Sequence, residues 1–247
     1  MKIFIVNLKK DIERKKSIQH QSEKLELDVE FIEAVNGREL SQDEIKLFCP
    51  DFHKSSMTLG ELGCSLSHLK IYEKMVKENI QLALIMEDDA EIGRDIREIL
   101  DFLITIDNKN LHKPNIFLLS KVNEYIDTFK KPLIKDYHLV SVIDAALTHG
   151  YVVNKSAAKR LLDFLRPVWL VADEWKLLRE NNVIKLKAVV PSVINFTEHS
   201  RNSSIGNEGH STVNELDIQK RKRKFLTALR LMFWRVFVRS WVKKVRP

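Results

Sequence analysis

Cysteine, glycine and proline are scarce in this sequence, and each shortage excludes a class of protein. The 247 residues include two cysteines, Cys49 and Cys64, which lack a close metal-type spacing and follow no secretory signal. We therefore expect two reduced, buried thiols in a cytoplasmic protein. Seven glycines, six prolines and no repeat of fixed period argue against collagen-like, solenoid and low-complexity chains.

A long apolar run is also missing at the start of the chain. The apolar core of MKIFIVNLKK is too short for a signal peptide and is typical of a first β-strand. With 44% hydrophobic residues, the chain is nevertheless able to bury one substantial core. The length therefore predicts one domain, or one domain with an appendage.

The net charge of +7 is concentrated in one segment. Residues 218–247 hold eleven Lys and Arg and no Asp or Glu, which leaves residues 1–217 with 30 basic and 34 acidic side chains. We therefore expect a mildly acidic catalytic or binding domain over 1–217 and a basic tail over 218–247. A tail of this charge is expected to meet an anionic surface, either membrane or nucleic acid.

Strand-like and helix-like segments alternate along the domain. Apolar, β-type runs predict strands at 2–8, 29–37, 82–86, 116–120 and 186–190. Helical patterns lie between them, at 9–27, 58–79, 154–165 and 172–181. Thr58 and Glu61 have the spacing of a capping box, and Asn154 is a predicted N-cap. This alternation predicts an α/β fold with a mostly parallel central sheet.

The predicted strand 82–86 runs straight into three carboxylates, Glu87, Asp88 and Asp89. Carboxylates this close repel one another unless a cation, hydrogen bonds or water compensate them. Ligands of α/β sheets bind outside the carboxyl ends of the strands, which is where we expect this cluster. One of the three could instead cap the next segment, because Asp is a good N-cap, but a cap accounts poorly for three carboxylates.

Five stretches of the chain occur in an order that is characteristic of one family. They are IFIVNLKKDIERK, FIEAVNGREL, LGELGCSLSHLKIYEKMV, ALIMEDDAEI and THGYVVNKSAAKRLL. Together they resemble the bacterial glycosyltransferase family 25, the lipooligosaccharide galactosyltransferase-like enzymes. The resemblance implies a GT-A-like fold and an inverting transfer of a hexose, commonly galactose from UDP-galactose in β-linkage. The implied acceptor is a lipooligosaccharide or lipopolysaccharide glycan.

The acidic cluster then resembles the metal motif of such enzymes. Glu87 and Asp89 are the expected metal ligands, and they flank Asp88, which we assign to the donor. A divalent cation, Mn²⁺ or Mg²⁺, would stabilise the negative charge that develops on the departing nucleoside diphosphate. Carboxylate oxygens are the ligands that such hard cations prefer.

The same resemblance assigns further residues to the donor site. Those near the first strand are Asn7, Leu8 and Arg14, although Arg14 could also lie on a solvated helix face. Glu61, Ser67 and His68 match the family's LGELGCSLSH block. Glu61 could serve only as a helix cap, and a histidine among leucines is more often a packed, hydrogen-bonded residue than a catalyst.

An inverting transferase also needs a general base for the acceptor hydroxyl, and a carboxylate suits its oxocarbenium-like transition state. Asp173 is the first candidate and Asp144 the second, while His68 is also assigned to the catalytic group. The position of Asp173 equally suits a helix N-cap. We expect three residues of the THGY stretch to line the sugar site, namely Thr148, His149 and Tyr151.

The basic tail predicts an amphipathic helix from Phe225 onward. Three arginines, Arg230, Arg235 and Arg239, interrupt its apolar arc, so we do not expect it to span a bilayer. We expect it to lie on an anionic membrane, at the cytoplasmic face of the inner membrane. The alternative is a terminal helix packed on the domain or on a second subunit.

Two other functions remain open on the sequence. A degenerate transferase fold could act as an inactive module that binds glycans or nucleotide sugars. A nucleic-acid-binding protein is disfavoured, because no platform of stacking aromatics among basic residues occurs outside the tail. We therefore expect a UDP-sugar, a lipid-linked glycan and a membrane as partners, and no nucleic acid.

Overall fold

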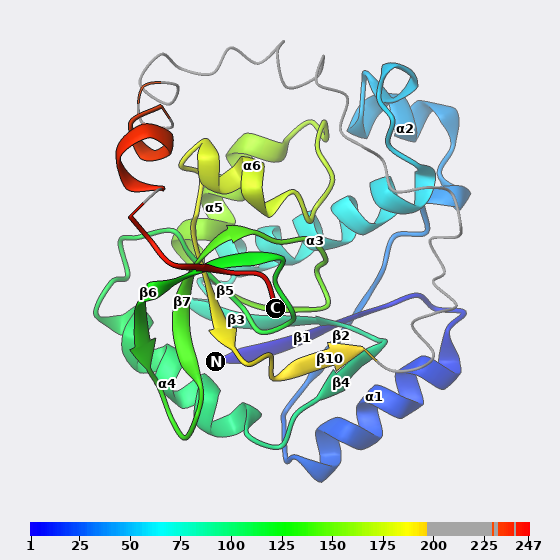
Figure 1. The fold of residues 1–247 in the computed structure, drawn as a ribbon. Helices are drawn as coiled ribbons and strands as arrows, with labels where there is room; N and C mark the ends of the chain where they lie inside the picture. The colour runs from blue at the N-terminus through cyan, green and yellow to red at the C-terminus, as the bar shows by residue number, and fades with distance from the viewer. Residues whose placement is uncertain (197–228, 230–231, 240) are drawn as a thin grey trace.

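The computed structural model describes residues 1–196, 229, 232–239 and 241–247, and a nine-stranded sheet forms its centre (Figure 1). The strand order across this sheet is β11-β6-β7-β9-β5-β8-β3-β1-β2. The strands are β1 (Lys2–Asn7), β2 (Glu30–Glu33), β3 (Leu82–Glu87), β5 (Asn115–Leu118), β6 (Glu124–Pro132), β7 (His138–Asp144), β8 (Gly150–Asn154), β9 (Lys185–Val190) and β11 (Lys244–Val245). A second sheet pairs β4 (Ala90–Ile92) with β10 (Ile194–Phe196).

Most strands of the central sheet point the same way. Strands β1, β2, β3, β5, β6 and β9 share one direction, and β7, β8 and β11 run against them. The predicted α/β class with a mostly parallel sheet is therefore confirmed. The antiparallel β8 lies between β3 and β5, and its first residue, Gly150, pairs with Met86. Residues just before β8 consequently lie beside the carboxyl end of β3.

Helices cover both faces of the sheet (Figure 1). On one face lie α1 (Ile12–Lys24) and α4 (Ile96–Asn108), which bury Ile18 and Ile99 against the strands. On the other face lie α3 (Leu59–Lys77), α5 (Lys155–Leu165) and α6 (Trp175–Glu180), with α2 (Gln42–Phe48) beyond the start of α3. Their buried side chains, among them Leu62, Leu161 and Trp175, form a second core.

The two predicted helix starts are confirmed by hydrogen bonds. At the start of α3, Thr58 Oγ1 accepts from Glu61 N at 3.2 Å, and Glu61 Oε2 accepts from Thr58 N at 2.8 Å. Asn154 Oδ1 accepts from Ala157 N at 2.9 Å and so caps α5. Both caps satisfy backbone N–H groups that have no partner within their helix.

The turn after β2 packs backbone to backbone on α3. Gly37, in the short 3₁₀ helix Gly37–Glu39, lies against Gly63 of α3. A Cβ atom on Gly63 would lie 2.5 Å from Val35 O and 2.6 Å from Gly37 N. Ser67 supports the same contact, because its hydroxyl accepts from Val35 N at 2.8 Å. These glycines therefore fix the segment that follows β2 beside α3.

The last described residues return to the sheet. Lys244 and Val245 pair with Ile126 and Tyr125 of β6, and Val242 is buried. Residues 218–228, 230, 231 and 240 of the predicted tail lie outside the described part of the chain. Within the part that is described, no helix has both the length and the apolar character needed to cross a membrane.

The glycine contact predicts the effect of one added methyl group. Gly63→Ala should lower the free energy of unfolding by about 1–3 kcal/mol, because the helix and the turn must move apart. Helix propensity alone would raise stability by about 1 kcal/mol. Denaturant unfolding measures the sign, and a more stable variant would show that the contact is not tight.

Candidate active site

A pocket opens at the carboxyl ends of β1 and β3, next to the first turns of α3. It encloses about 760 Å³ of empty space, part of which is open solvent. Its polar lining includes Lys10, Asp11, Arg14, Asn36, Arg38, Cys64, Ser67, His68, Glu87, Asp88 and Asp89. The three predicted carboxylates therefore line one pocket, and Leu8 lies in its wall.

Asp88 faces β1 and α1. Its Oδ2 accepts from Asn7 Nδ2 at 2.7 Å, and its Oδ1 lies 3.5 Å from a guanidinium nitrogen of Arg14. Burial raises the pKa of Asp88 to about 6, although the Asn7 hydrogen bond and the Arg14 charge act in the opposite direction. Asn7, Arg14 and Asp88, assigned together to the donor, are thus in contact.

Glu87 faces α3 and the segment before β8. Thr148 Oγ1 donates a hydrogen bond to its Oε1, which also lies 3.8 Å from His68 Nε2. Its Oε2 lies 3.8 Å from His149 Nε2. Burial alone would raise the pKa of Glu87, but the charge of His149 and the nearby His68 ring hold it well below its ordinary value.

Asp89, the third carboxylate, lies between His149 and Arg14. His149 Nε2 lies 3.4 Å from Asp89 Oδ1, and Asp89 Oδ2 lies 3.7 Å from Arg14. Burial alone would lower the pKa of His149, but the nearby carboxylates of Asp89 and Glu87 raise it above its ordinary value. Because folding raises the pKa of His149, its pairing with the carboxylates stabilises the protein fully at a pH below the unfolded-state pKa. This contribution to stability is lost as the pH rises through the pKa of His149 in the folded state.

His68 is held by two tyrosines of the core. Its Nδ1 lies 2.7 Å from Tyr151 Oη, which lies 2.6 Å from Tyr72 Oη. Tyr151 is fully buried and is not among the described residues that line the pocket, so its place in a sugar site stays a prediction. The alternation of side chains along β8 turns Tyr151 toward α3, where it orients His68.

Asp173 holds the loop that carries Thr148 and His149. Its Oδ2 accepts from Leu147 N at 3.1 Å, and Trp175 Nε1 donates to Leu147 O at 2.9 Å. Leu147 has a φ of 75°, a left-handed conformation that these two bonds maintain. The alternative role of Asp173 as an N-cap is not observed, because the N-cap of α6 is Glu174. Burial raises the pKa of Asp173, and the charges of Glu87 and Glu61 add to the effect.

Several predicted residues have structural roles or lie apart. Glu61 is used in the capping box, and the Ser67 hydroxyl bonds Val35 N and Gly63 O. Asp144 ends β7, where its carboxylate accepts from Asn123 at 3.1 Å and lies 3.8 Å from Lys176. Glu61 and Asp144 are not among the described residues that line the pocket, and neither are Asn7, Thr148, His149, Tyr151 and Asp173.

Other residues that line the pocket were not predicted from the sequence. Lys10, Asn36 and Arg38 reach the pocket from the segments after β1 and β2. The Asn-Gly turn at residues 36 and 37 was the available signal, because it follows a predicted strand. Cys64, expected only to pack, lines the pocket and is partly exposed, whereas Cys49 is buried as expected. Burial raises the pKa of the Cys64 thiol well above its ordinary value, and the charge of Glu87 adds to this.

The sequence was compared with known protein families and proteins. Residues 1–175 match the model of glycosyltransferase family 25, described as an LPS biosynthesis protein. The chain belongs to this family. A glycosyltransferase 25 family member of Aedes aegypti is 34% identical over 173 residues, which cover 65% of this chain and 28% of that protein. Procollagen galactosyltransferase 1-A of Xenopus laevis is 26% identical and covers the same shares. The matched region of this family 25 chain thus spans less than a third of the length of each of these two relatives.

The fold has also been compared with solved structures. A glycosyltransferase involved in the glycosylation of the major capsid of PBCV-1 has a TM-score of 0.35 and 10% identity, covering 79% of this chain and 91% of that one. Similarity at this level does not indicate a shared function.

Glu87, Asp89 and His149 of this family 25 chain could hold a divalent ion. One donor atom from each lies within 4.8 Å of the other two. Two carboxylates suit Mg²⁺ or Mn²⁺. An imidazole nitrogen is a ligand that the hard Mg²⁺ ion seldom takes, so of the two the set favours Mn²⁺.

This donor set predicts how Mn²⁺ binding depends on pH. A protonated His149 competes with the cation, so affinity should fall as the pH is lowered from about 8 to 6, with about one proton released per bound ion. Titration calorimetry in buffers of different ionisation enthalpy measures this proton. His149→Gln should bind Mn²⁺ more weakly and with little pH dependence. A wild-type affinity that is constant over this range would exclude His149 as a ligand.

Proposed function

We propose that this family 25 chain is an inverting hexosyltransferase that moves galactose from UDP-galactose onto a lipopolysaccharide or lipooligosaccharide glycan in β-linkage. Family membership supports glycosyl transfer. The family description and the names of the procollagen galactosyltransferases support the choice of glycan and sugar.

One observation carries this proposal: the acidic cluster Glu87, Asp88 and Asp89 and three basic side chains converge on one pocket at the carboxyl ends of β1 and β3. The basic residues Lys10, Arg14 and Arg38 supply positive charge for a diphosphate. The carboxylates Glu87 and Asp89, with His149, would hold a divalent ion. That ion, when bound, supplies charge stabilisation for the leaving nucleoside diphosphate.

The remaining requirement is a base for the acceptor hydroxyl. Asp173 is the residue we assign to this role, because a half-buried carboxyl with a raised pKa accepts a proton closer to neutral pH. Its contact with Leu147 N orients the carboxylate and ties it to the loop of Thr148 and His149. Asp144, the second candidate, is engaged with Asn123 and Lys176.

A binding module without activity is the second candidate function. It would retain the pocket and bind a nucleotide sugar but transfer nothing. Product analysis with UDP-galactose and a lipooligosaccharide acceptor separates the two, since only the enzyme releases UDP in proportion to glycan extended.

Neutralising one carboxylate should remove donor turnover. UDP-galactose with Mn²⁺ should raise the thermal midpoint of the wild type more than UDP-glucose or UDP-N-acetylglucosamine does. Asp89→Asn should lose most of this Mn²⁺-dependent shift and about 100-fold or more in turnover, because a charge aimed at the diphosphate is lost.

Glu91→Gln is the matched control, because Glu91 is exposed and lies two residues away on β4. It removes the same charge and should behave as the wild type. Equal losses in both variants would assign the effect to net charge rather than to the pocket, and an Asp89→Asn enzyme of full activity would refute the proposed metal role.

We also propose that the carboxy-terminal segment attaches the enzyme to an anionic membrane. Five apolar side chains are 57–84% exposed there, namely Met232, Phe233, Val236, Phe237 and Trp241. The exposed basic residues Arg239, Lys243, Lys244 and Arg246 lie in the same segment. Apolar side chains beside basic ones are typical of helices that bind the headgroup layer.

Two phenylalanines of this segment provide the test. The rings of Phe233 and Phe237 lie 5.0 Å apart, and exchanging both for Ser should weaken binding to phosphatidylglycerol-containing vesicles by about tenfold or more. Leu111→Ser, at an apolar residue of 51% exposure elsewhere on the surface, is the control. Unchanged vesicle binding of the double variant in a sedimentation assay would contradict the membrane proposal.

A further inference from the structure

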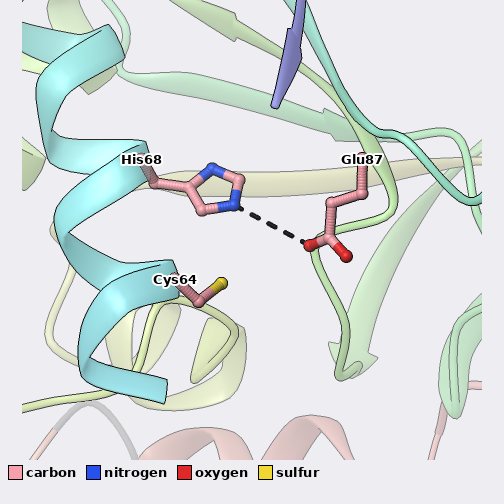
Figure 2. Close-up of side chains that lie close together, drawn as sticks. All are labelled: Cys64, His68 and Glu87. Carbon is pink, nitrogen blue, oxygen red and sulfur yellow. Dashed lines mark ion pairs between the residues drawn. The ribbon is translucent and has the colours of Figure 1, made fainter. Parts of the chain in front are cut away.

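Cys64 and His68 lie one turn apart on α3 and face Glu87 at the end of β3 (Figure 2). One donor atom from each residue lies within 4.8 Å of the other two. Cys64 Sγ also lies 3.9 Å from Thr148 Oγ1, which donates to Glu87. This set therefore combines sulfur, nitrogen and oxygen, unlike the oxygen-rich set around Asp89.

The orientation of His68 prepares it for a ligand. Its Nδ1 is engaged by Tyr151, while the buried Nε2 has no hydrogen-bond partner among the described residues and points toward Glu87. Buried nitrogens without partners are rare, and the residue is only 1% exposed. Metal-binding histidines ordinarily hold one ring nitrogen in a hydrogen bond and offer the other to the metal.

The spacing also suits a tetrahedral ion. Ligands of Zn²⁺ at bond lengths of about 2.0–2.3 Å lie about 3.3–3.8 Å apart. His68 Nε2 and Glu87 Oε1 lie 3.8 Å apart, a few tenths of an ångström more than the ~3.4 Å that tetrahedral Zn²⁺ requires of a nitrogen and an oxygen ligand. Cys64 Sγ lies within 4.8 Å of both donor atoms, so it has to move about 1 Å closer to share a tetrahedral centre with them. All three residues line the pocket, so a fourth position is open to water or to a ligand from the pocket.

We propose that Cys64, His68 and Glu87 form a second metal site, selective for a cation of the Zn²⁺ class. Thiolate and imidazole ligands favour such ions over Mg²⁺ or Mn²⁺. Binding replaces the thiol proton by a metal–sulfur bond, and the proton passes to the solvent. Glu87 belongs to both sets, and its Oε1 faces His68 while its Oε2 faces His149, so one carboxylate can offer an oxygen to each site.

Cobalt absorption tests the site without any sugar donor. Co²⁺ added to the full chain should produce the near-ultraviolet thiolate charge-transfer band with one equivalent, and Zn²⁺ should abolish the band by displacement. Cys64→Ser should lose the band and bind Zn²⁺ at least about tenfold more weakly. Cys49→Ser, which removes the other thiol, should keep both properties.

Three results would overturn the proposal: no thiolate band in the wild type, a band that survives Cys64→Ser, or a band lost in Cys49→Ser. Circular dichroism shows whether each variant is folded, and Cys64→Ala provides a second exchange at the same position. Because no nucleotide sugar is present, failure of this test leaves the transferase proposal untouched. Failure of donor binding likewise leaves the cobalt result intact.

Discussion

The site depends on how three adjacent carboxylates are compensated, two of which are buried and one half-buried. Asp88 and Asp89 are 9% and 7% exposed, and their charges would repel one another without compensation. The compensating groups come from separate elements: Asn7 from β1, Arg14 from α1 and His149 from the segment before β8. The acidic strand end is therefore stable only when the sheet and α1 have assembled around it.

This dependence makes the antiparallel β8 central to the architecture. A parallel strand in its place would bring its carboxyl end, not its start, to the carboxyl end of β3. Because β8 runs antiparallel to β3, Thr148 and His149, which precede β8, lie beside Glu87 at the end of β3. Glu87 N donates a hydrogen bond to His149 O at 3.2 Å. The same pairing turns Tyr151 inward to hold His68.

The features that were predictable from the sequence are local ones. The helix caps formed by Thr58 with Glu61 and by Asn154 were predictable, because each depends on residues within three positions. The apolar run before Glu87 likewise predicted that the acidic cluster lies at the end of a strand. Sequence patterns did not indicate the direction of β8 or the pairing of β11, because strand order depends on contacts between distant residues. For the same reason, the roles of Tyr151 and of Asp173 toward Leu147 became visible only in the fold.

The return of the chain to β6 has a consequence for solubility. Without β11, the nine-residue β6 would present the backbone N–H and C=O groups of its outer edge as a template for another molecule's strand. The two-residue β11 covers part of this rim, and Lys243 beside Asp127 and Arg246 beside Glu124 hold it there. Within the described residues, the edge strand is then β11, which is short and positively charged. Both properties discourage edge-to-edge pairing between copies of the protein.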